Sequence, residues 1–76
     1  MRDFLLYIVQ NLVENPDEIE ITERDGSGET VLQLRVARSD MGKVIGRGGR
    51  IAKEIRTLVR AAAQRRGERV TVDILD

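Results

Sequence analysis

Residues 44–51 read Val-Ile-Gly-Arg-Gly-Gly-Arg-Ile and are the most informative stretch of this chain. Three of the seven glycines fall within four residues, with Arg47 inside the group and Arg50 directly after it. Glycine takes backbone angles closed to other residues and lets a ligand approach the main chain closely. The stretch also opens the longest helix that the sequence predicts, so helical N–H groups and the positive end of the helix dipole point into it. These features together predict an anion site, and the anion we expect is a phosphate.

The charges are segregated along the chain although they cancel overall. The chain has 13 basic and 13 acidic side chains in 76 residues. Residues 1–40 carry a net charge of −5, residues 41–70 carry +7, and the last six residues carry −2. Such segregation indicates either a local cationic surface or ordinary solvated faces. The coincidence of the basic segment with the glycine-rich stretch favours a cationic surface.

Composition argues against several classes of protein. A chain of this length has room for one domain, which we assign to residues 1–76. Without cysteine, neither disulfides nor thiolate metal sites are expected. No apolar run approaches the roughly 18 residues of a membrane span, and residues 1–4 do not resemble the start of a signal peptide. We therefore expect a cytoplasmic protein without a membrane partner. Because histidine is also absent, we expect no enzyme, no metal site and no cofactor.

The N-terminal segment is expected to form a helix over residues 3–15. Asp3 is the expected N-cap, and the proline after Asn15 ends the helix because it disfavours helical angles at the preceding residue. Both aromatic residues of the chain, Phe4 and Tyr7, fall here, and we expect them to pack in the core. The apolar arc is broad enough to leave a self-association surface open. It comprises Phe4, Leu5, Ile8, Val9, Leu12 and Val13.

Alternating apolar residues predict three strands, over residues 19–23, 30–37 and 69–75. The first two are joined by a turn over residues 25–28 and form an antiparallel hairpin. Short and long helices are expected over residues 41–45 and 50–66, with Ser39 or Asp40 capping the first and Gly67 ending the second. The apolar face of the long helix comprises Ile51, Ala52, Ile55, Leu58, Val59, Ala62 and Ala63.

This order of elements predicts an α+β fold. The last strand returns after a helical crossover, so it should lie parallel to the second strand through a right-handed connection. The expected architecture is helix-strand-strand-helix-helix-strand, with a three-stranded mixed sheet and its helices packed on one face.

The glycine-rich stretch does not fit the two common nucleotide-binding loops. A Walker loop has four residues between its glycines and then Lys-Ser/Thr, whereas Arg50-Ile51 follows Gly49. A dinucleotide fingerprint needs a glycine where Ile51 stands and a strand leading directly into the loop. The basic helix that continues from the loop favours a polymer of phosphates over a single nucleotide.

What fits is a Gly-x-x-Gly loop, residues 46–49, between two helices, preceded by Val44-Ile45 and followed by Ile51. This pattern resembles the signature of the KH RNA-binding domain. The order of elements resembles the type II (bacterial) KH fold over essentially the whole chain. A free-standing domain of this length resembles the small bacterial single-KH proteins of the KhpA family.

The resemblance implies that the loop clamps the backbone of about four nucleotides of single-stranded RNA. Gly46, Gly48 and Gly49 would let the RNA backbone approach, and Arg47 would meet a phosphate. Arg50, Lys53 and Lys43 would extend the cationic rim. Val44, Ile45 and Ile51 would form an apolar floor for bases, and which of them faces the core is left open. The resemblance further implies RNA chaperoning, and roles in cell-wall homeostasis and cell length together with a larger KH-containing partner, KhpB.

Two points stay open at this level. The stripe of Lys53, Arg56 and Arg60 is either solvated surface or a further RNA contact. The alternative function is a protein-interaction module with little RNA affinity, in which residues 61–63, three alanines, allow close packing against a second copy or a partner KH domain.

Overall fold

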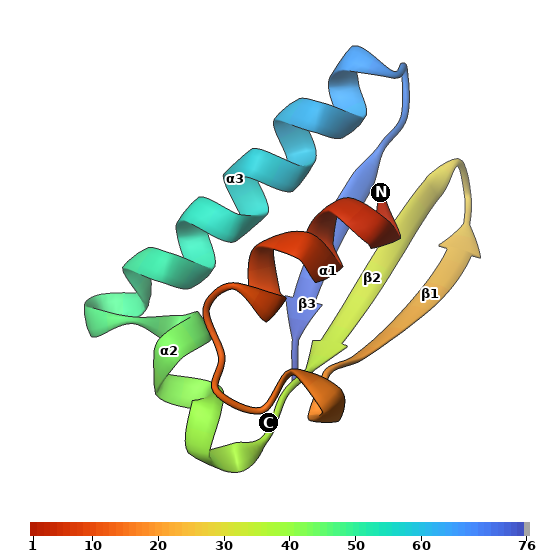
Figure 1. Cartoon of the computed structure of the whole chain (residues 1–76). Helices are drawn as coiled ribbons and strands as arrows, with labels where there is room; N and C mark the ends of the chain where they lie inside the picture. The colour runs from red at the N-terminus through yellow and green to blue at the C-terminus, as the bar shows by residue number, and fades with distance from the viewer. Residues whose placement is uncertain (76) are drawn as a thin grey trace.

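The sheet contains three strands, β1 (Glu20–Gly26), β2 (Glu29–Arg35) and β3 (Val70–Ile74), in the order β1-β2-β3. In this computed structural model, which describes residues 1–75, β1 and β2 are antiparallel whereas β2 and β3 are parallel (Figure 1). The predicted hairpin, the mixed sheet and the parallel return of the last strand are therefore confirmed.

The hairpin is longer and its turn is tighter than the sequence predicts. The strands continue to Gly26 and resume at Glu29, so only Ser27 and Gly28 form the turn. Both turn residues have positive φ, +24° and +79°. Two-residue hairpin turns require such angles because they match the twist of the strands. The polar composition of residues 25–28 suggested a four-residue turn, but the outer two residues pair in the ladder.

The first helix, α1, spans Arg2–Gln10 and is shorter than predicted. Its N-cap is Met1, without a side-chain hydrogen bond, so the prediction that Asp3 caps the helix is wrong. It ends at Asn11 rather than at Asn15. Pro16 instead begins a 3₁₀ turn, Pro16–Glu18, consistent with the preference of proline for the first helical position.

Three large apolar side chains that were expected in the core lie at the surface. Phe4 is 36% exposed, Tyr7 63% and Leu58 51%. The expectation that both aromatic residues pack in the core is wrong, because Leu5 and Val9 are the residues of α1 that face the sheet and are buried. The apolar arc of α1 is thus wider than the surface against which it packs.

Between β2 and β3, a 3₁₀ turn (Arg38–Asp40) leads into α2 (Met41–Ile45), and a second one (Arg47–Gly49) leads into α3 (Arg50–Arg65). These bounds agree closely with the predicted helices. Gly67, with φ +71°, ends α3 as predicted. The N–H groups of Gly67 and Glu68 donate to the carbonyls of Gln64 and Ala63, which is the Schellman arrangement.

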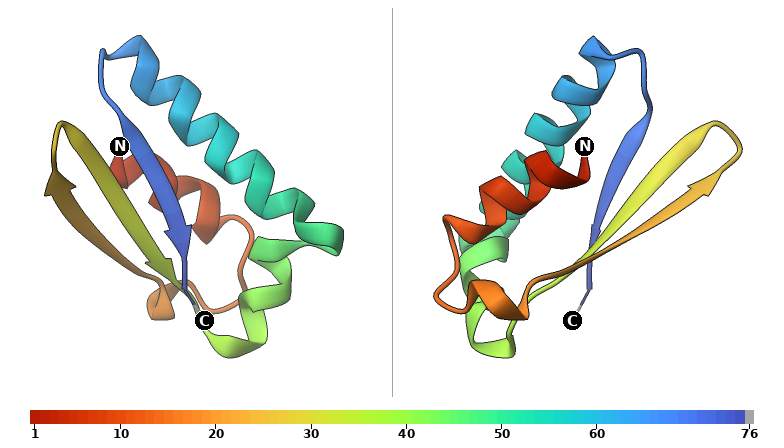
Figure 2. Two further views of the ribbon diagram at one scale, coloured as in Figure 1. Left: turned by 180° about the vertical axis from the view of Figure 1, so that it is seen from behind. Right: turned by 45° about the vertical axis from the view of Figure 1, so that its right-hand side comes forward.

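The helices α1 and α3 cover the same face of the sheet (Figure 2). Their buried residues meet Leu32 and Leu34 of β2 and Val70 and Val72 of β3 in a single apolar core. The fold is therefore α+β in the predicted order, with helices on one face. No helix within residues 1–75 combines the length and apolar character needed to cross a bilayer.

Candidate nucleic-acid interface

Gly46 begins the glycine-rich loop and is the position where only glycine fits. Its φ and ψ are +76° and 172°, a region that other residues essentially do not enter. A Cβ at this position would lie 2.9 Å from both the Cβ and the backbone nitrogen of Ile51. The chain thus turns directly over the first turn of α3, and this contact fixes the position of the loop.

Gly48 and Gly49 shape the outer side of the same loop. Both have left-handed angles, with φ +66° and +77°. A Cβ at either position would meet no atom within 4 Å. The main chain on this side therefore has open space around it, which is compatible with the close approach of a ligand.

The loop leads into the N-terminus of α3, which carries no compensating negative charge. Gly49 is the N-cap without a side-chain hydrogen bond, and the first turn has no acidic residue. The positive end of the helix dipole therefore faces the loop unopposed. Arg47, Arg50 and Lys53 are all exposed around it, and the only ion pairs within residues 1–75 belong to Lys43. This arrangement suits an anion.

Lys43 differs from the other cations of the predicted site. Its Nζ lies 3.9 Å from a carboxylate oxygen of Glu14 and 3.8 Å from one of Asp40. A cation held between two carboxylates contributes less to the local positive potential than a free one. We therefore assign Lys43 a smaller part in anion binding than Arg47 or Arg50.

The three apolar residues of the predicted floor do not share one environment. Val44 is fully buried in the core, so it cannot touch a ligand in this conformation. Ile45 and Ile51 are half-buried and pack against the core from its edge. The structure thus answers which residue faces inward, and it leaves Ile45 and Ile51 as the available apolar contacts beside the loop.

Arg56 connects the basic face of α3 to the edge of the sheet. Its Nε donates to the backbone carbonyl of Val72 in β3 at 3.3 Å. Lys53, Arg56 and Arg60 follow one another at helical spacing, so they share one flank of α3. This flank therefore runs beside β3, which is one of the two edge strands of the sheet within residues 1–75. Helical periodicity in the sequence predicted that these three cations share one face of the helix, but it could not predict that β3 lies beside them.

Asp40 is a structural residue of the site whose role the sequence did not reveal. It is only 1% exposed. Of the two predicted caps of α2, Asp40 rather than Ser39 occupies the N-cap position, but its side chain makes no capping hydrogen bond there. Its carboxylate instead accepts hydrogen bonds from the backbone N–H groups of Glu14 and Asn15 at 3.1 and 3.0 Å, and from Asn15 Nδ2 at 3.1 Å. Asp40 thereby ties the segment after α1 to the start of α2, which leads into the loop.

The hydrogen bonds of Asp40 make stability depend on pH. The N–H of Glu14 is the main influence that holds the pKa of Asp40 below its ordinary value of 3.8, against the opposing effect of burial. A group whose pKa is lowered by folding stabilises the fold above its unfolded-state pKa and loses this effect as the pH falls toward the folded-state value. The contribution of Asp40 is therefore fully present at neutral pH and declines progressively as the pH falls below about 3.8 toward the lower folded-state pKa.

An Asp40→Asn variant is expected to unfold several degrees below the wild type at pH 7, because one acceptor becomes a donor facing backbone N–H groups. The difference in Tm should shrink on going from pH 5 to pH 3. Thermal unfolding followed by circular dichroism measures both quantities. Asp17→Asn, which changes an exposed carboxylate, is the control and should leave Tm nearly unchanged. A constant difference between Asp40→Asn and the wild type across this pH range would contradict the assignment.

The chain matches known proteins over almost its full length. A family model for the KH domain of KhpA/KhpB covers residues 2–74. The chain belongs to this family. It is 48% identical over 75 residues to the RNA-binding protein KhpA of Clostridium acetobutylicum, a match that covers 99% of this chain and 100% of the relative. It is 43% identical over 76 residues to the protein of the same name from Chlamydia caviae, covering 100% and 97% of the two chains. With the KhpA of Borreliella burgdorferi the identity is 46% over 74 residues, covering 97% and 90%.

Membership of the KhpA/KhpB family confirms three predictions from the sequence. The resemblance to small KH proteins of the KhpA type is correct, and so is the KH fold. Because KH domains of this family are not enzymes, the prediction that the chain has no catalytic activity also holds. Within residues 1–75, no three His, Cys, Asp or Glu side chains are grouped closely enough to hold a metal ion.

Proposed function

We propose that this KhpA/KhpB-family protein binds single-stranded RNA and clamps its backbone with residues 46–49. The observation that carries the proposal is the geometry of this loop. Its main chain is bare at Gly48 and Gly49, Arg47 is exposed beside them, and the N-terminus of α3 lies behind it without a negative charge in its first turn. Each of these features favours a phosphate.

A strand fits the site better than a single nucleotide does. The cationic residues do not end at the loop but continue along one flank of α3 through Lys53 to Arg56, which contacts β3. A linear array of cations matches the repeating phosphates of a polymer. Ile45 and Ile51, half-buried beside the loop, would contact unstacked bases, and loops of this type hold about four nucleotides.

The names of the relatives support RNA as the ligand, since each is called RNA-binding protein KhpA. By the same likeness we propose a cytoplasmic protein that acts as an RNA chaperone. It would work with a larger KH-containing partner of the KhpB type in cell-wall homeostasis and cell length. These cellular roles rest on the likeness to the KhpA family alone.

The salt dependence of RNA binding tests the clamp. About three phosphate contacts, from Arg47, Arg50 and Lys53, give an expected slope of log K against log salt near −2, at about −0.7 per contact for single strands. Arg47→Ala is expected to weaken binding and to reduce the slope by about 0.7. Fluorescence anisotropy of a labelled oligonucleotide at several salt concentrations measures both effects.

The control for that experiment is Arg24→Ala, which removes an exposed arginine from β1. It should leave both affinity and slope close to those of the wild type. If Arg47→Ala and Arg24→Ala gave the same slope as the wild type, Arg47 would not contact a phosphate.

A second candidate function is self-association, which the exposed apolar residues of α1 and α3 favour. Phe4, Leu58, Ala61 and Ala62 line a surface depression together with Arg65 and Arg66. Small alanines on α3 allow another helix to approach closely, and the aromatic ring at the rim offers apolar contact. This surface lies on the flank of α3 opposite to Arg56, so a dimer formed there would leave the loop free.

Leu58→Asp is expected to abolish such a dimer, because it places a charge in the middle of the apolar surface. Sedimentation over a range of micromolar concentrations should show the wild type shifting from monomer to dimer and the variant staying monomeric. Thr57→Asp, one residue away on the exposed side of α3, is the matched control. A wild type that remains a monomer at tens of micromolar would exclude this second function.

A further inference from the structure

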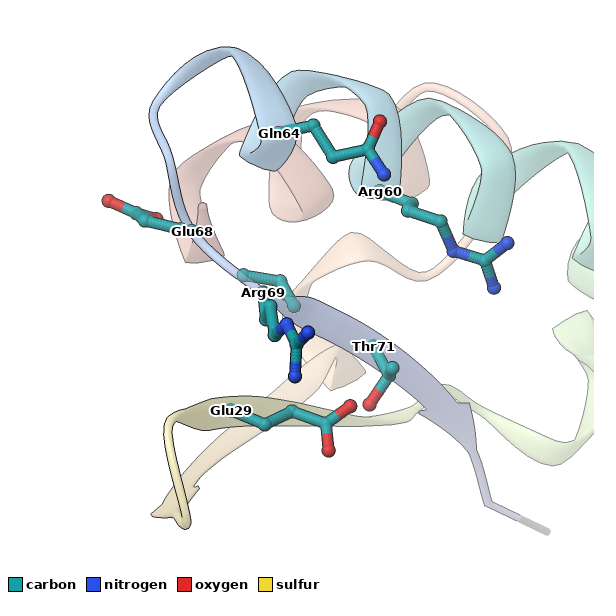
Figure 3. A pocket seen from close by; sticks show the side chains of 7 residues that line it. Glu29, Arg60, Gln64, Glu68, Arg69 and Thr71 are labelled. Carbon is teal, nitrogen blue, oxygen red and sulfur yellow. The ribbon is translucent and has the colours of Figure 1, made fainter.

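A cavity of about 250 Å³ lies at the far end of α3 from the glycine-rich loop. Its lining side chains include Arg60 and Gln64 from α3, Arg69 and Thr71 at the start of β3, and Glu29 from β2 (Figure 3). These residues come from three elements that are separate in the sequence. No motif of the sequence pointed to this cavity, because only the parallel pairing of β2 with β3 brings Glu29 next to α3.

The cavity lies on the same flank of α3 as the cationic rim of the loop. Lys53, Arg56, Arg60 and Gln64 are separated by three or four residues and therefore share one side of the helix. From Lys53 to Gln64 this side extends over about 16 Å, at 1.5 Å per residue. In Figure 3 the guanidinium of Arg60 extends toward the N-terminal half of α3. Arg60 thus stands between the loop and the cavity.

The backbone of β3 adds hydrogen-bonding groups to this flank. The carbonyl of Arg69 accepts from Thr30, and the N–H of Leu75 donates to Leu34, so the peptide groups of alternate residues from Arg69 to Leu75 face β2. Because peptide groups alternate in direction along a strand, those of Val70 and Val72 face away from β2, out of the open edge of the sheet. The carbonyl of Val72 accepts a hydrogen bond from Arg56, whereas Val70 is one of the residues that line the cavity.

The chemistry of the lining suits a base rather than a phosphate. A phosphate site would present only donors and positive charge, but here the carboxylate of Glu29 offers only acceptors. The carboxylate of Glu68 points away from the other lining side chains (Figure 3). Gln64 offers both a donor and an acceptor, and Arg60 and Arg69 offer donors. The edge of a nucleobase also combines donors and acceptors in one plane. Single-stranded RNA presents such edges because its bases are unstacked and unpaired.

We propose that this cavity reads one base of the RNA strand whose backbone the loop clamps. The proposal rests on the proposed function and adds to it a second contact point, about 16 Å along α3 from Lys53. Glu29 accepts a hydrogen bond from the edge of the base, and Gln64 forms the other hydrogen bonds to the same edge. Arg60 binds the phosphate next to that base. The loop then supplies affinity without sequence preference, and the cavity supplies preference at one position.

Selection from a random pool of single-stranded RNA 12-mers tests the proposal. The wild type is expected to enrich sequences with about tenfold discrimination at one position, the size expected for a base edge read by two side chains. In the Glu29→Gln/Gln64→Ala double variant that discrimination should fall to twofold or less, while preferences elsewhere in the motif stay. Both residues are exposed, so the variant should fold. Glu23→Gln/Gln10→Ala makes the same changes at exposed positions outside the cavity and should behave as the wild type.

The outcomes separate the two proposals. If the wild type and the Glu29→Gln/Gln64→Ala variant enrich the same motif with the same discrimination, the cavity does not read a base and this inference is wrong. If the wild type retains RNA but discriminates at no position, the inference about the cavity is likewise wrong. If the wild type retains no RNA at all, the clamp itself is wrong. Loss of all enrichment in a Gly48→Asp variant together with the single-position loss in the cavity variant supports both.

Discussion

A Gly46→Ala variant is expected to lose about 3 kcal/mol of unfolding free energy, from backbone strain of about 1–3 kcal/mol and a similar cost of overpacking. The methyl group would enter at φ +76° and ψ 172° and lie 2.9 Å from the backbone nitrogen of Ile51. Neither this nitrogen nor the Cβ of Ile51, which would also lie 2.9 Å away, can move without displacing the first turn of α3. Since a domain of this size is stabilised by only about 4–11 kcal/mol, this loss is large.

Urea unfolding of the variant and the wild type measures the loss. Gly48→Ala is the matched control, because its Cβ would meet no atom within 4 Å and it incurs only the left-handed strain of about 1–2 kcal/mol. Equal unfolding midpoints for Gly46→Ala and Gly48→Ala would show that the contact between Gly46 and Ile51 does not fix the loop.

The elements of this fold that were predicted correctly are those whose signals are local in the sequence. The glycines of residues 46–49 separate α2 from α3, and Gly67 ends α3. Both boundaries could be predicted because glycine itself adopts the backbone angles that interrupt a helix. Alternation of apolar residues likewise located all three strands. The parallel return of β3 followed from the helical crossover that connects it to β2 rather than from any single residue.

The errors arose where distant residues decide the outcome. The segment after α1 does not continue as a helix to Asn15, and the N–H groups of Glu14 and Asn15 instead bind the carboxylate of Asp40. The sequence of residues 11–15 contains no signal that predicts this contact. Similarly, Phe4 and Leu58 belong to apolar faces that are wider than the surfaces they meet, so helical periodicity alone could not place them outside the core.

The candidate site likewise has features that the sequence could predict and features that it could not. Its loop and its cations could be predicted, because glycine spacing and charge are properties of the sequence. The burial of Val44, the ion pairs of Lys43 and the position of Arg56 beside β3 could not, since each depends on how α2, α3 and the sheet are arranged. The cavity beside Gln64 depends on three elements at once and was missed entirely.

Gly48→Asp is expected to weaken binding of single-stranded RNA at least tenfold, while Gly48→Asn keeps most of the affinity. Asn and Asp are the residues other than glycine that best tolerate the left-handed angles at this position, and the space around it is open. The two variants are nearly identical in shape and differ in charge. A carboxylate about 4 Å from a bound phosphate costs about 1–4 kcal/mol at surface dielectric constants, and about 1.4 kcal/mol corresponds to tenfold in affinity.

The most direct test of the clamp is therefore one titration of a labelled single-stranded RNA with three proteins: wild type, Gly48→Asn and Gly48→Asp. Circular dichroism of each protein establishes that the fold is intact. The account predicts binding in the order wild type, Gly48→Asn, Gly48→Asp, with at least about a tenfold gap between the two variants that closes as salt is raised. Equal affinity of the folded Gly48→Asp variant and the wild type would contradict the claim that residues 46–49 hold the RNA backbone.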